Sequence, residues 1–416
     1  MTPMFRHGWR TCPLWTFLVV GAALWPAGCS QTSGTGIPPG TPMIRVLLLE
    51  NQQRVNLSAA APPTVQLAPG SPTRQLRFPP GVAVSVTLSS SGWQIGSASL
   101  GPGEMTLEPS VDGSLSVAEH SYRGRFRLIP VASDRFDVVN ELDLESYLPG
   151  VLRSELYPNW HLETYKAQAI VARTYALYEA RTEGIGRHFD VFCDQRSQVY
   201  GGLAAETARS RDAAQATAGI VVAFGAPGRE VIFKSYFSSC CGGVGQSAAD
   251  AFGDPQTPPL EAANHGNCCI ASPKFNWGAI IIAKPELTRR IRAWGAWKKQ
   301  PEKDIGQVTR IDIAAVNRLA RPVRFIVTDA RGVRYSLRSE QLHEALNTDA
   351  GNGVKLPSVF CKPIDEGTNI RFADGHGYGH GVGMCQWCAE EQAAQGWNDE
   401  AIVLTAFPGA KLVRAY

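Results

Sequence analysis

Hydrophobic residues alternate with small or polar residues through much of the first third of the chain, as expected for half-buried β-strands. The positions that follow this period of two include Val82, Val84, Val86, Leu88, Phe126 and Leu128. Clusters of Gly, Ser and Pro separate such runs and favour turns between strands. The pattern therefore predicts a strand-rich section over residues 44–135.

The pattern becomes helical after a turn-forming Pro-Asn pair at residues 158–159. Apolar or small side chains then recur three or four positions apart, at Leu162, Tyr165, Ala169, Ala172 and Ala176. This spacing places them on one face of a helix, and the alanine content and the acidic residue in the first turn favour the same structure. We therefore expect the clearest helix of the chain to begin near this pair.

Shorter elements of both types are expected after this helix. Helices are predicted over residues 206–218 and 390–395, and strands over 220–222, 231–233 and 323–327. No internal repeat with a period of roughly 20 to 50 residues is visible. We predict an α+β (mixed α/β) fold, in which the strand-rich section packs against a core over residues 136–416 that carries the long helix and glycine-rich loops.

The N-terminus has the pattern of an export signal. Basic residues within positions 6–10 precede an apolar run over 14–24, and small residues follow up to Cys29. The run is too short to span a bilayer, so we predict a signal peptide over residues 1–28. Its Pro-Ala-Gly-Cys ending resembles a bacterial lipobox, whose cysteine is acylated, although Pro26 stands where an aliphatic residue is usual. Plain secretion and an uncleaved anchor are the alternatives.

A flexible tether is predicted between this signal and the fold, over residues 29–43. Residues 30–42 are rich in Ser, Thr, Gly and Pro and have no apolar periodicity. We therefore expect an exported protein of the cell envelope that a lipid on Cys29 holds at the membrane.

The overall composition is that of an ordinary globular protein. Of its 416 residues, 44% are hydrophobic and 19% are charged, and the formal net charge is +3. This length allows one large domain or two smaller ones. A nearly neutral chain lacks the basic footprint of a dedicated nucleic-acid-binding protein, so we expect no nucleic-acid partner.

Four segments combine charged, aromatic and glycine residues in dense motifs. In chain order they read LESYLPGVLRSE (144–155) with KAQA (166–169) and ARTY (172–175), CD (193–194) with QVYGG (198–202), SYFSSCCGG (235–243), and GYGHGVGMCQWCA (377–389). We call them the first to fourth motifs. Their content and their order resemble the motifs of the SpoIID/LytB family.

This resemblance implies a function in the bacterial cell wall. The family glutamate that matches Glu155 is assigned to catalysis, which implies a peptidoglycan lytic transglycosylase acting on MurNAc-GlcNAc strands, with a preference for strands without stem peptides. In the alternative, the same groove is not catalytic and binds glycan or activates a cell-wall amidase. Cys241 and Cys385, where the family usually has serine, and Cys388, where it usually has glycine, favour such a diverged role.

The position of Glu155 suits glycan cleavage in chemical terms. Cleavage needs an acid that protonates the leaving oxygen, and the resulting carboxylate can then take a proton from the C6 hydroxyl of muramic acid, which closes an anhydro ring without water. Leu156, Tyr157 and Trp160 lie close in sequence and are expected to desolvate the carboxyl group, which would raise its pKa. The alternative is a structural carboxylate at the start of a helix, stabilised by the helix dipole.

Polar side chains of the four motifs are candidates for binding sugar hydroxyls or carboxylates. For those on the long helix, the alternative is a solvated helix face. His380 lies among closely spaced glycines, where backbone can approach a ligand, and a structural hydrogen bond is its alternative. The candidate substrate-binding residues are Lys166, Arg173, Tyr175, Gln198, Tyr200, Ser238, Ser239, His380 and Gln386.

The cysteines permit a complete set of disulfides. Of the ten in the chain, Cys12 is lost with the predicted signal peptide and Cys29 would be acylated, which leaves eight. An even number in an exported protein is typical of disulfide pairing, although the connectivity cannot be read from the sequence.

The same cysteines also have the spacing of metal ligands, because Cys385 and Cys388 form a CxxC motif. The candidate ligands are His188, Cys193, Cys240, Cys241, Cys268, Cys269, Cys385 and Cys388. Some relatives in the family bind zinc through one histidine and two cysteines in the segment that matches residues 188–198, where this chain has Ser197 in place of the later cysteine. No cofactor is required by the proposed chemistry, zinc is the alternative to disulfides, and a metal or redox protein is a third class of function. In either form we expect most of these cysteines to converge close to Glu155.

Overall fold

The structure is a computed structural model that describes residues 40–67, 70–76, 78–110, 113–351 and 353–416. The predicted signal peptide, Cys29 and most of the predicted tether lie outside these described residues. Within them, no helix is both long and apolar enough to cross a membrane. The contacts between residues group the described chain into one compact unit.

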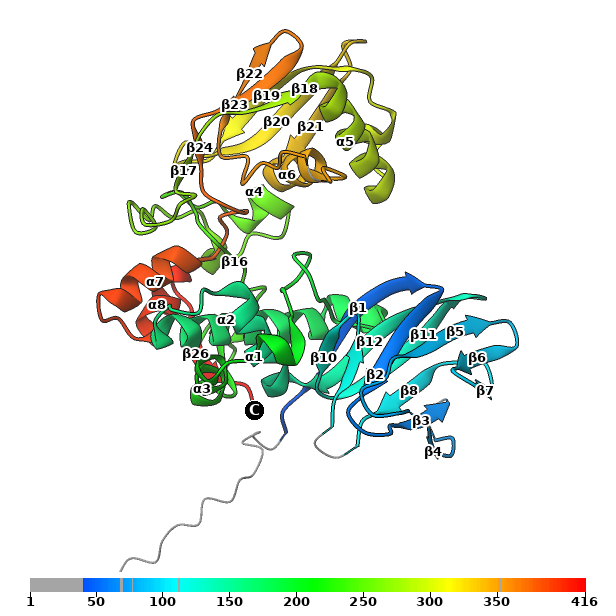
Figure 1. Ribbon diagram of the computed structural model, residues 1–416. Helices are drawn as coiled ribbons and strands as arrows, with labels where there is room; N and C mark the ends of the chain where they lie inside the picture. Colours follow the sequence, from blue (N-terminus) through cyan, green and yellow to red (C-terminus); the bar gives the residue numbers. More distant parts are fainter. Residues whose placement is uncertain (1–39, 68–69, 77, 111–112, 352) are drawn as a thin grey trace, which may run out of the picture. The chain divides into compact units, whose positions relative to one another are not determined.

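Strands that form two sheets make up the N-terminal part (Figure 1). The strands are β1 (Met43–Gln52), β2 (Arg54–Ala59), β3 (Thr64–Leu67), β4 (Arg74–Gln75), β5 (Val84–Ser89), β6 (Gly92–Ile95), β7 (Ala98–Leu100), β8 (Met105–Glu108), β9 (Leu115–Val117), β10 (His120–Tyr122), β11 (Arg125–Ala132), β12 (Arg135–Asp143) and β13 (Val191–Phe192). One sheet has the order β13-β1-β12-β11-β8-β3-β4, and the other has the order β10-β9-β2-β5-β6-β7. Strand β13 pairs with β1 in parallel, whereas β1 and β12 are antiparallel.

Most apolar positions of the period-two pattern face one shared core, whereas Val82 precedes β5 and is 52% exposed. Val86 of β5 and Val138 of β12 are fully buried. Trp93 of β6 packs edge-on against Phe136 of β12, with ring centroids 4.9 Å apart, so the two sheets contribute to the same hydrophobic cluster.

Two helices, α1 (Leu144–Glu155) and α2 (Leu162–Arg181), follow the last long strand. The Asp143 carboxylate caps α1 by accepting a hydrogen bond from the Ser146 N–H, and α1 continues through Pro149. Helix α2 begins where the spacing of apolar residues predicts. The same core contains α3 (Ala208–Ala216), β14 (Ile220–Phe224), β15 (Val231–Ile232), β16 (Phe237–Ser238), α4 (Ala248–Phe252), β25 (Met384–Cys385), α7 (Gln386–Ala394), α8 (Asp399–Ala406) and β26 (Lys411–Arg414), with short 3-10 turns at Glu183–Gly186, Gly202–Ala205 and Pro258–Leu260.

The residues that lie between α4 and β25 in the sequence form a separate hydrophobic core. It is built from β17 (Asn276–Trp277), β18 (Ile280–Ala283), α5 (Lys284–Lys298), a 3-10 turn at Pro301–Asp304, β19 (Val308–Val316), β20 (Pro322–Asp329), β21 (Arg334–Arg338), α6 (Ser339–Asn347), β22 (Lys362–Glu366), β23 (Asn369–Ala373) and β24 (Gly375–His376). Strands β14 and β16 precede this region in the sequence, and β25 and β26 follow it. Because β16 pairs in parallel with β25 and β14 pairs with β26, residues 276–376 are inserted between two halves of one core. The fold class is α+β, as the sequence predicts.

Candidate active site

Glu155 is the last residue of α1, and its side chain is partly exposed. Its carboxylate Oε1 accepts a hydrogen bond from the Val199 N–H at 2.8 Å. Its other oxygen, Oε2, accepts one from Gln386 Nε2 at 3.4 Å. The carboxylate therefore joins the first, second and fourth motifs, which are far apart in the sequence.

The third motif reaches the same place through the backbone. The Ser239 carbonyl accepts a hydrogen bond from the Trp387 N–H at 3.1 Å. Ser238 lies opposite Cys385 in the β16–β25 pair, and its Oγ accepts a hydrogen bond from the Gly381 N–H at 3.2 Å. All four motifs thus meet around the end of α1 and the start of α7.

Gly150 allows α1 to lie directly against the second motif. Its carbonyl accepts a hydrogen bond from the Gly201 N–H at 3.3 Å. A Cβ atom at this position would lie 2.8 Å from a ring carbon of Tyr200 and 3.0 Å from the Gly202 carbonyl oxygen. The absence of a side chain therefore permits the contact that keeps Val199 next to Glu155.

Burial raises the pKa of Glu155, and the hydrogen bonds from the Val199 N–H and Gln386 oppose this effect only in part. The carboxylate lies at the C-terminal end of α1, where the helix dipole is negative and does not stabilise an anion. The alternative interpretation, a carboxylate at the start of a helix, is therefore wrong. A carboxyl group with a raised pKa is suited to donate a proton near neutral pH.

Aromatic side chains form a surface beside Glu155. Tyr157 is 51% exposed, and its ring lies 5.2 Å from Trp160 and 5.8 Å from Trp387, measured between ring centroids. Trp160 is buried and packs edge-on against Trp387, with centroids 5.0 Å apart. Since Trp387 follows Gln386 directly, the surface is fixed next to the carboxylate.

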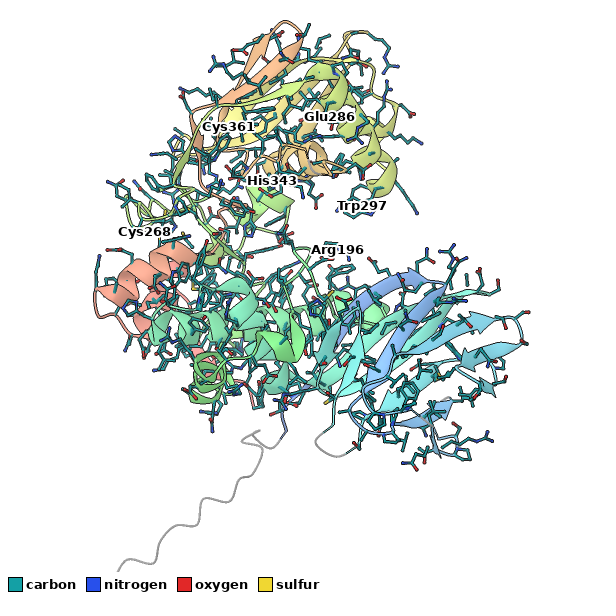
Figure 2. The ribbon with its side chains drawn as sticks, in the orientation of Figure 1. Arg196, Cys268, Glu286, Trp297, His343 and Cys361 are labelled. Carbon is teal, nitrogen blue, oxygen red and sulfur yellow. A yellow bond between two sulfur atoms is a disulfide. The ribbon has the colours of Figure 1, made fainter. Side chains whose placement is uncertain are left out.

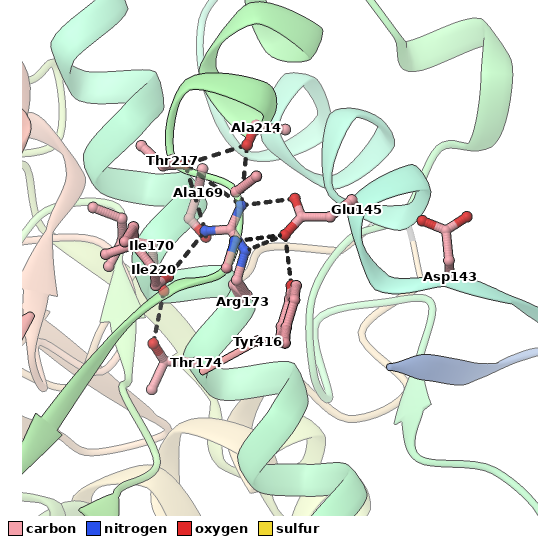
Figure 3. Close-up of polar contacts among 12 residues, drawn as sticks. Asp143, Glu145, Ala169, Ile170, Arg173, Thr174, Ala214, Thr217, Ile220 and Tyr416 are labelled. Carbon is pink, nitrogen blue, oxygen red and sulfur yellow. Dashed lines mark hydrogen bonds and ion pairs between the residues drawn. The ribbon is translucent and has the colours of Figure 1, made fainter. Parts of the chain in front are cut away.

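Arg173 does not face a substrate, which corrects its assignment as a substrate-binding residue. Its side chain is fully buried, and its Nε and Nη2 atoms each donate to the Glu145 carboxylate at 2.8 Å (Figure 3). The remaining guanidinium donors bind the Ala214 and Ile220 carbonyls. The guanidinium therefore links α1, α2, α3 and β14, and its role is structural.

Three further candidates are also buried inside the core. Gln198 is fully buried, accepts a hydrogen bond from the Tyr147 hydroxyl at 3.2 Å and donates to the Ala172 carbonyl. Tyr200 is buried and donates its hydroxyl to Asn140. Burial also raises the pKa of Tyr175 to about 12. Gln198 and Tyr200 hold the second motif in place, and none of the three side chains offers surface to a glycan.

The other candidates lie closer to the surface. Lys166 is partly exposed and pairs with Glu163 at 2.7 Å, and Ser239 is partly exposed. Burial lowers the pKa of His380 to about 4, so its imidazole is neutral at neutral pH, and its Nδ1 accepts a hydrogen bond from the Val382 N–H. His380 in this state provides no positive charge for a sugar carboxylate.

Six cysteines gather in one cluster, which we call the cysteine cluster: Cys240, Cys241, Cys268, Cys269, Cys385 and Cys388. It lies next to the candidate site, because Cys385 directly precedes Gln386, which contacts Glu155. The other two candidate ligands lie elsewhere. His188 Nε2 is bound to Asp137 at 2.8 Å, and the Cys193 thiol donates to the Leu48 carbonyl.

His188 and Cys193 do not fit a zinc site of the kind that the resemblance implies. The group of potential metal ligands found within the described ranges consists of Cys241, Cys268, Cys269 and Cys388, and contains neither of these two residues. The side chain of Ser197, in the position of the missing cysteine, accepts a hydrogen bond from the Phe192 N–H. This segment therefore has a structural role in place of a metal site.

Three groups of the site were not predicted from the sequence. The Val199 N–H holds the Glu155 carboxylate, although only its neighbours in the second motif were candidates. Tyr157 was expected to desolvate Glu155, whereas half of its surface is exposed, and Trp387 was not a candidate at all. A tryptophan next to a polar motif residue was the available signal for the aromatic surface.

Comparisons with known proteins agree with this arrangement of motifs. The profile of the SpoIID family, stage II sporulation protein, matches residues 132–224, which contain the first and second motifs. An uncharacterised protein of Brachyspira hyodysenteriae is 28% identical over 299 residues, which cover 70% of this chain and 72% of that protein. The amidase enhancer of Bacillus subtilis is 22% identical over 296 residues, which cover 64% of this chain but only 40% of the enhancer. Residues 132–224 therefore match the SpoIID family, and the similarity to an amidase enhancer agrees with a cell-wall-related family.

Proposed function

We propose that this protein is a lytic transglycosylase that cleaves MurNAc-GlcNAc strands of peptidoglycan, preferably strands without stem peptides. The observation that carries the proposal is the environment of Glu155. Its carboxyl group has a raised pKa, lies at the meeting point of four motifs, and is held by a backbone N–H at 2.8 Å. A cell-wall role and a location outside the cytoplasm agree with the family.

The proposed reaction uses Glu155 first as an acid and then as a base. The protonated carboxyl group gives its proton to the bridging glycosidic oxygen while positive charge builds up at the anomeric carbon. The resulting carboxylate then accepts the proton of the C6 hydroxyl, whose oxygen bonds to the anomeric carbon and closes a 1,6-anhydro ring. The Val199 N–H stabilises the carboxylate form of Glu155 between the two steps. The proton taken from the C6 hydroxyl restores the acid form for another cycle.

We expect Tyr157 to contact a sugar ring, because its exposed face lies beside the reacting carboxyl group. Tyr157→Ala should raise the KM for glycan by roughly 3- to 10-fold, as expected for the loss of one aromatic contact. Tyr157→Phe keeps the ring and should keep the parent KM. Trp297→Ala, at an equally exposed tryptophan on α5, is the matched control. An unchanged KM for Tyr157→Ala would exclude this contact.

The pH profile should report the protonation of Glu155. Because the acid form starts the reaction, kcat/KM should fall as the pH rises through the raised pKa of Glu155. Gln386→Leu removes a hydrogen bond that lowers this pKa, so the fall should move to higher pH. Gln395→Leu, at an exposed glutamine at the end of α7, should leave the profile unchanged. A shift to lower pH in Gln386→Leu would contradict this assignment.

Digestion of purified glycan strands tests the proposed function. The parent protein should release soluble fragments from strands without stem peptides faster than from strands that retain them. Fragments are separated by chromatography and identified by mass spectrometry. Binding of the strands without any release of fragments would overturn the enzymatic proposal.

A second candidate function is the activation of a cell-wall amidase. The observation that favours it is the similarity to a protein named amidase enhancer. In that case the protein should increase the release of stem peptides by an added cell-wall amidase, and Glu155→Gln should retain this effect.

Lipid attachment at Cys29 also stays a prediction.

A further inference from the structure

The cysteine cluster brings together three separate segments of the chain. Cys240 and Cys241 follow β16, Cys268 and Cys269 lie in the turn before β17, and Cys385 and Cys388 lie at the end of β25 and in the first turn of α7. Five of them are buried, and Cys268, which Figure 2 labels, is partly exposed. The family resemblance assigns no role to these residues.

Four of the sulfur atoms lie close enough together to surround one ion once the bond between Cys268 and Cys388 is reduced. The Sγ atoms of Cys241, Cys268, Cys269 and Cys388 all lie within 4.8 Å of one another. The Sγ of Cys241 is 3.6 Å from that of Cys269 and 4.0 Å from that of Cys388. Tetrahedral Zn–S bonds of about 2.3 Å place neighbouring ligand sulfurs about 3.8 Å apart, between these two values.

Disulfide pairing does not account for the whole cluster. Cys268 and Cys388 form a disulfide in the structure, with their Cα atoms 4.9 Å apart. Cys240, Cys241, Cys269 and Cys385 are free and buried. One bond explains the approach of two sulfurs, whereas a central cation explains why four sulfurs from three segments converge.

A buried positive charge lies beside the cluster. Arg321 is 2% exposed, and its Nη1 donates to the carbonyls of Cys241 and Val244. Within the part of the chain that the structure describes, its guanidinium makes hydrogen bonds only to backbone carbonyls and no ion pair with a carboxylate. A buried charge is normally paired, and four thiolates around a divalent cation would carry a net negative charge that pairs with this guanidinium.

We propose that Cys241, Cys268, Cys269 and Cys388 bind one zinc ion when their thiols are reduced. The ion joins the loop after β16, the turn before β17 and the first turn of α7. It thereby fixes Gln386 and Trp387 against the Glu155 side of the site. The disulfide between Cys268 and Cys388 is the metal-free form of the same pair of residues.

Metal analysis of the full-length protein tests this site. Protein purified under reducing conditions and given zinc should carry one zinc ion per chain by native mass spectrometry. Replacement of the zinc by cobalt should give the strong near-ultraviolet absorption of thiolate-to-cobalt charge transfer. Cys241→Ser and Cys269→Ser should each lower zinc affinity by at least tenfold and weaken this absorption.

Cys361→Ser is the matched control, because Cys361 is also buried and free but belongs to the core of the inserted region (Figure 2). This variant should bind zinc as the parent does. If a cluster variant fails to fold, the cobalt spectrum of the parent still tests the site, because this absorption arises only when thiolates bind the metal. Reduced parent protein that binds no zinc and gives no thiolate-to-cobalt absorption would overturn the proposal, as would equal metal binding by parent and cluster variants.

Discussion

Glu155→Gln should lower the rate of glycan cleavage by about 10²- to 10⁴-fold, the usual effect of losing a general acid or base. The amide keeps the size of the side chain but cannot donate a proton to the glycosidic oxygen or take one from the C6 hydroxyl. Thermal unfolding and glycan binding should stay close to those of the parent, because the Val199 N–H can still donate to the amide oxygen. Initial rates of fragment release measure the effect.

Glu163→Gln is the control for this variant. Glu163 is a nearby carboxylate that pairs with Lys166 and accepts a hydrogen bond from the Asp399 N–H, away from the meeting point of the motifs. Its replacement should leave the rate within a few-fold of the parent rate. If Glu155→Gln cleaved as fast as the parent, Glu155 would not be the catalytic group.

Arg173→Met should lower the free energy of unfolding by about 3–5 kcal/mol, because it leaves the buried Glu145 carboxylate without its positively charged partner. Burial alone would raise the pKa of Glu145, but the hydrogen bonds and charge of Arg173 lower it below its ordinary value. A carboxylate with a lowered pKa stabilises the fold at neutral pH, and this stabilisation is lost as the pH falls through the folded-state pKa. Chemical denaturation at several pH values measures both effects.

Arg289→Met provides the matched comparison. Arg289 on α5 pairs with Glu286 at the surface, where the two side chains are 49% and 35% exposed. Removal of such a surface pair should cost only about 0–1 kcal/mol. Equal unfolding curves for the two variants would contradict the structural role assigned to Arg173.

The elements with a clear period were predictable from the sequence. Helix α2 follows from apolar positions three or four apart, and β20 follows from alternation over 323–327, because each period matches the geometry of its element. Helix α1 was missed because its Pro149 and Gly150 are typical of turns. Contacts with the second motif stabilise the helix across these two residues, and such contacts are not visible in a local pattern.

The site was predictable in its residues more than in their roles. The resemblance of the motifs to a known family indicated Glu155, whereas the spacing of the cysteines indicated a disulfide or metal cluster. Whether a polar residue faces a groove or a core depends on packing, so Arg173 and Gln198 could not be placed in advance. The inserted region over residues 276–376 was also missed, since its boundaries have no linker composition or repeat.

The most direct test of the central claim is the chemistry of the product ends. Glycan strands without stem peptides are incubated with the protein in water labelled with heavy oxygen, and the fragments are analysed by mass spectrometry. Ring closure by Glu155 predicts fragments with 1,6-anhydro ends and no oxygen from the solvent. Reducing ends that carry the heavy oxygen would show hydrolysis, and intact strands would show no cleavage, and either result would contradict a lytic transglycosylase.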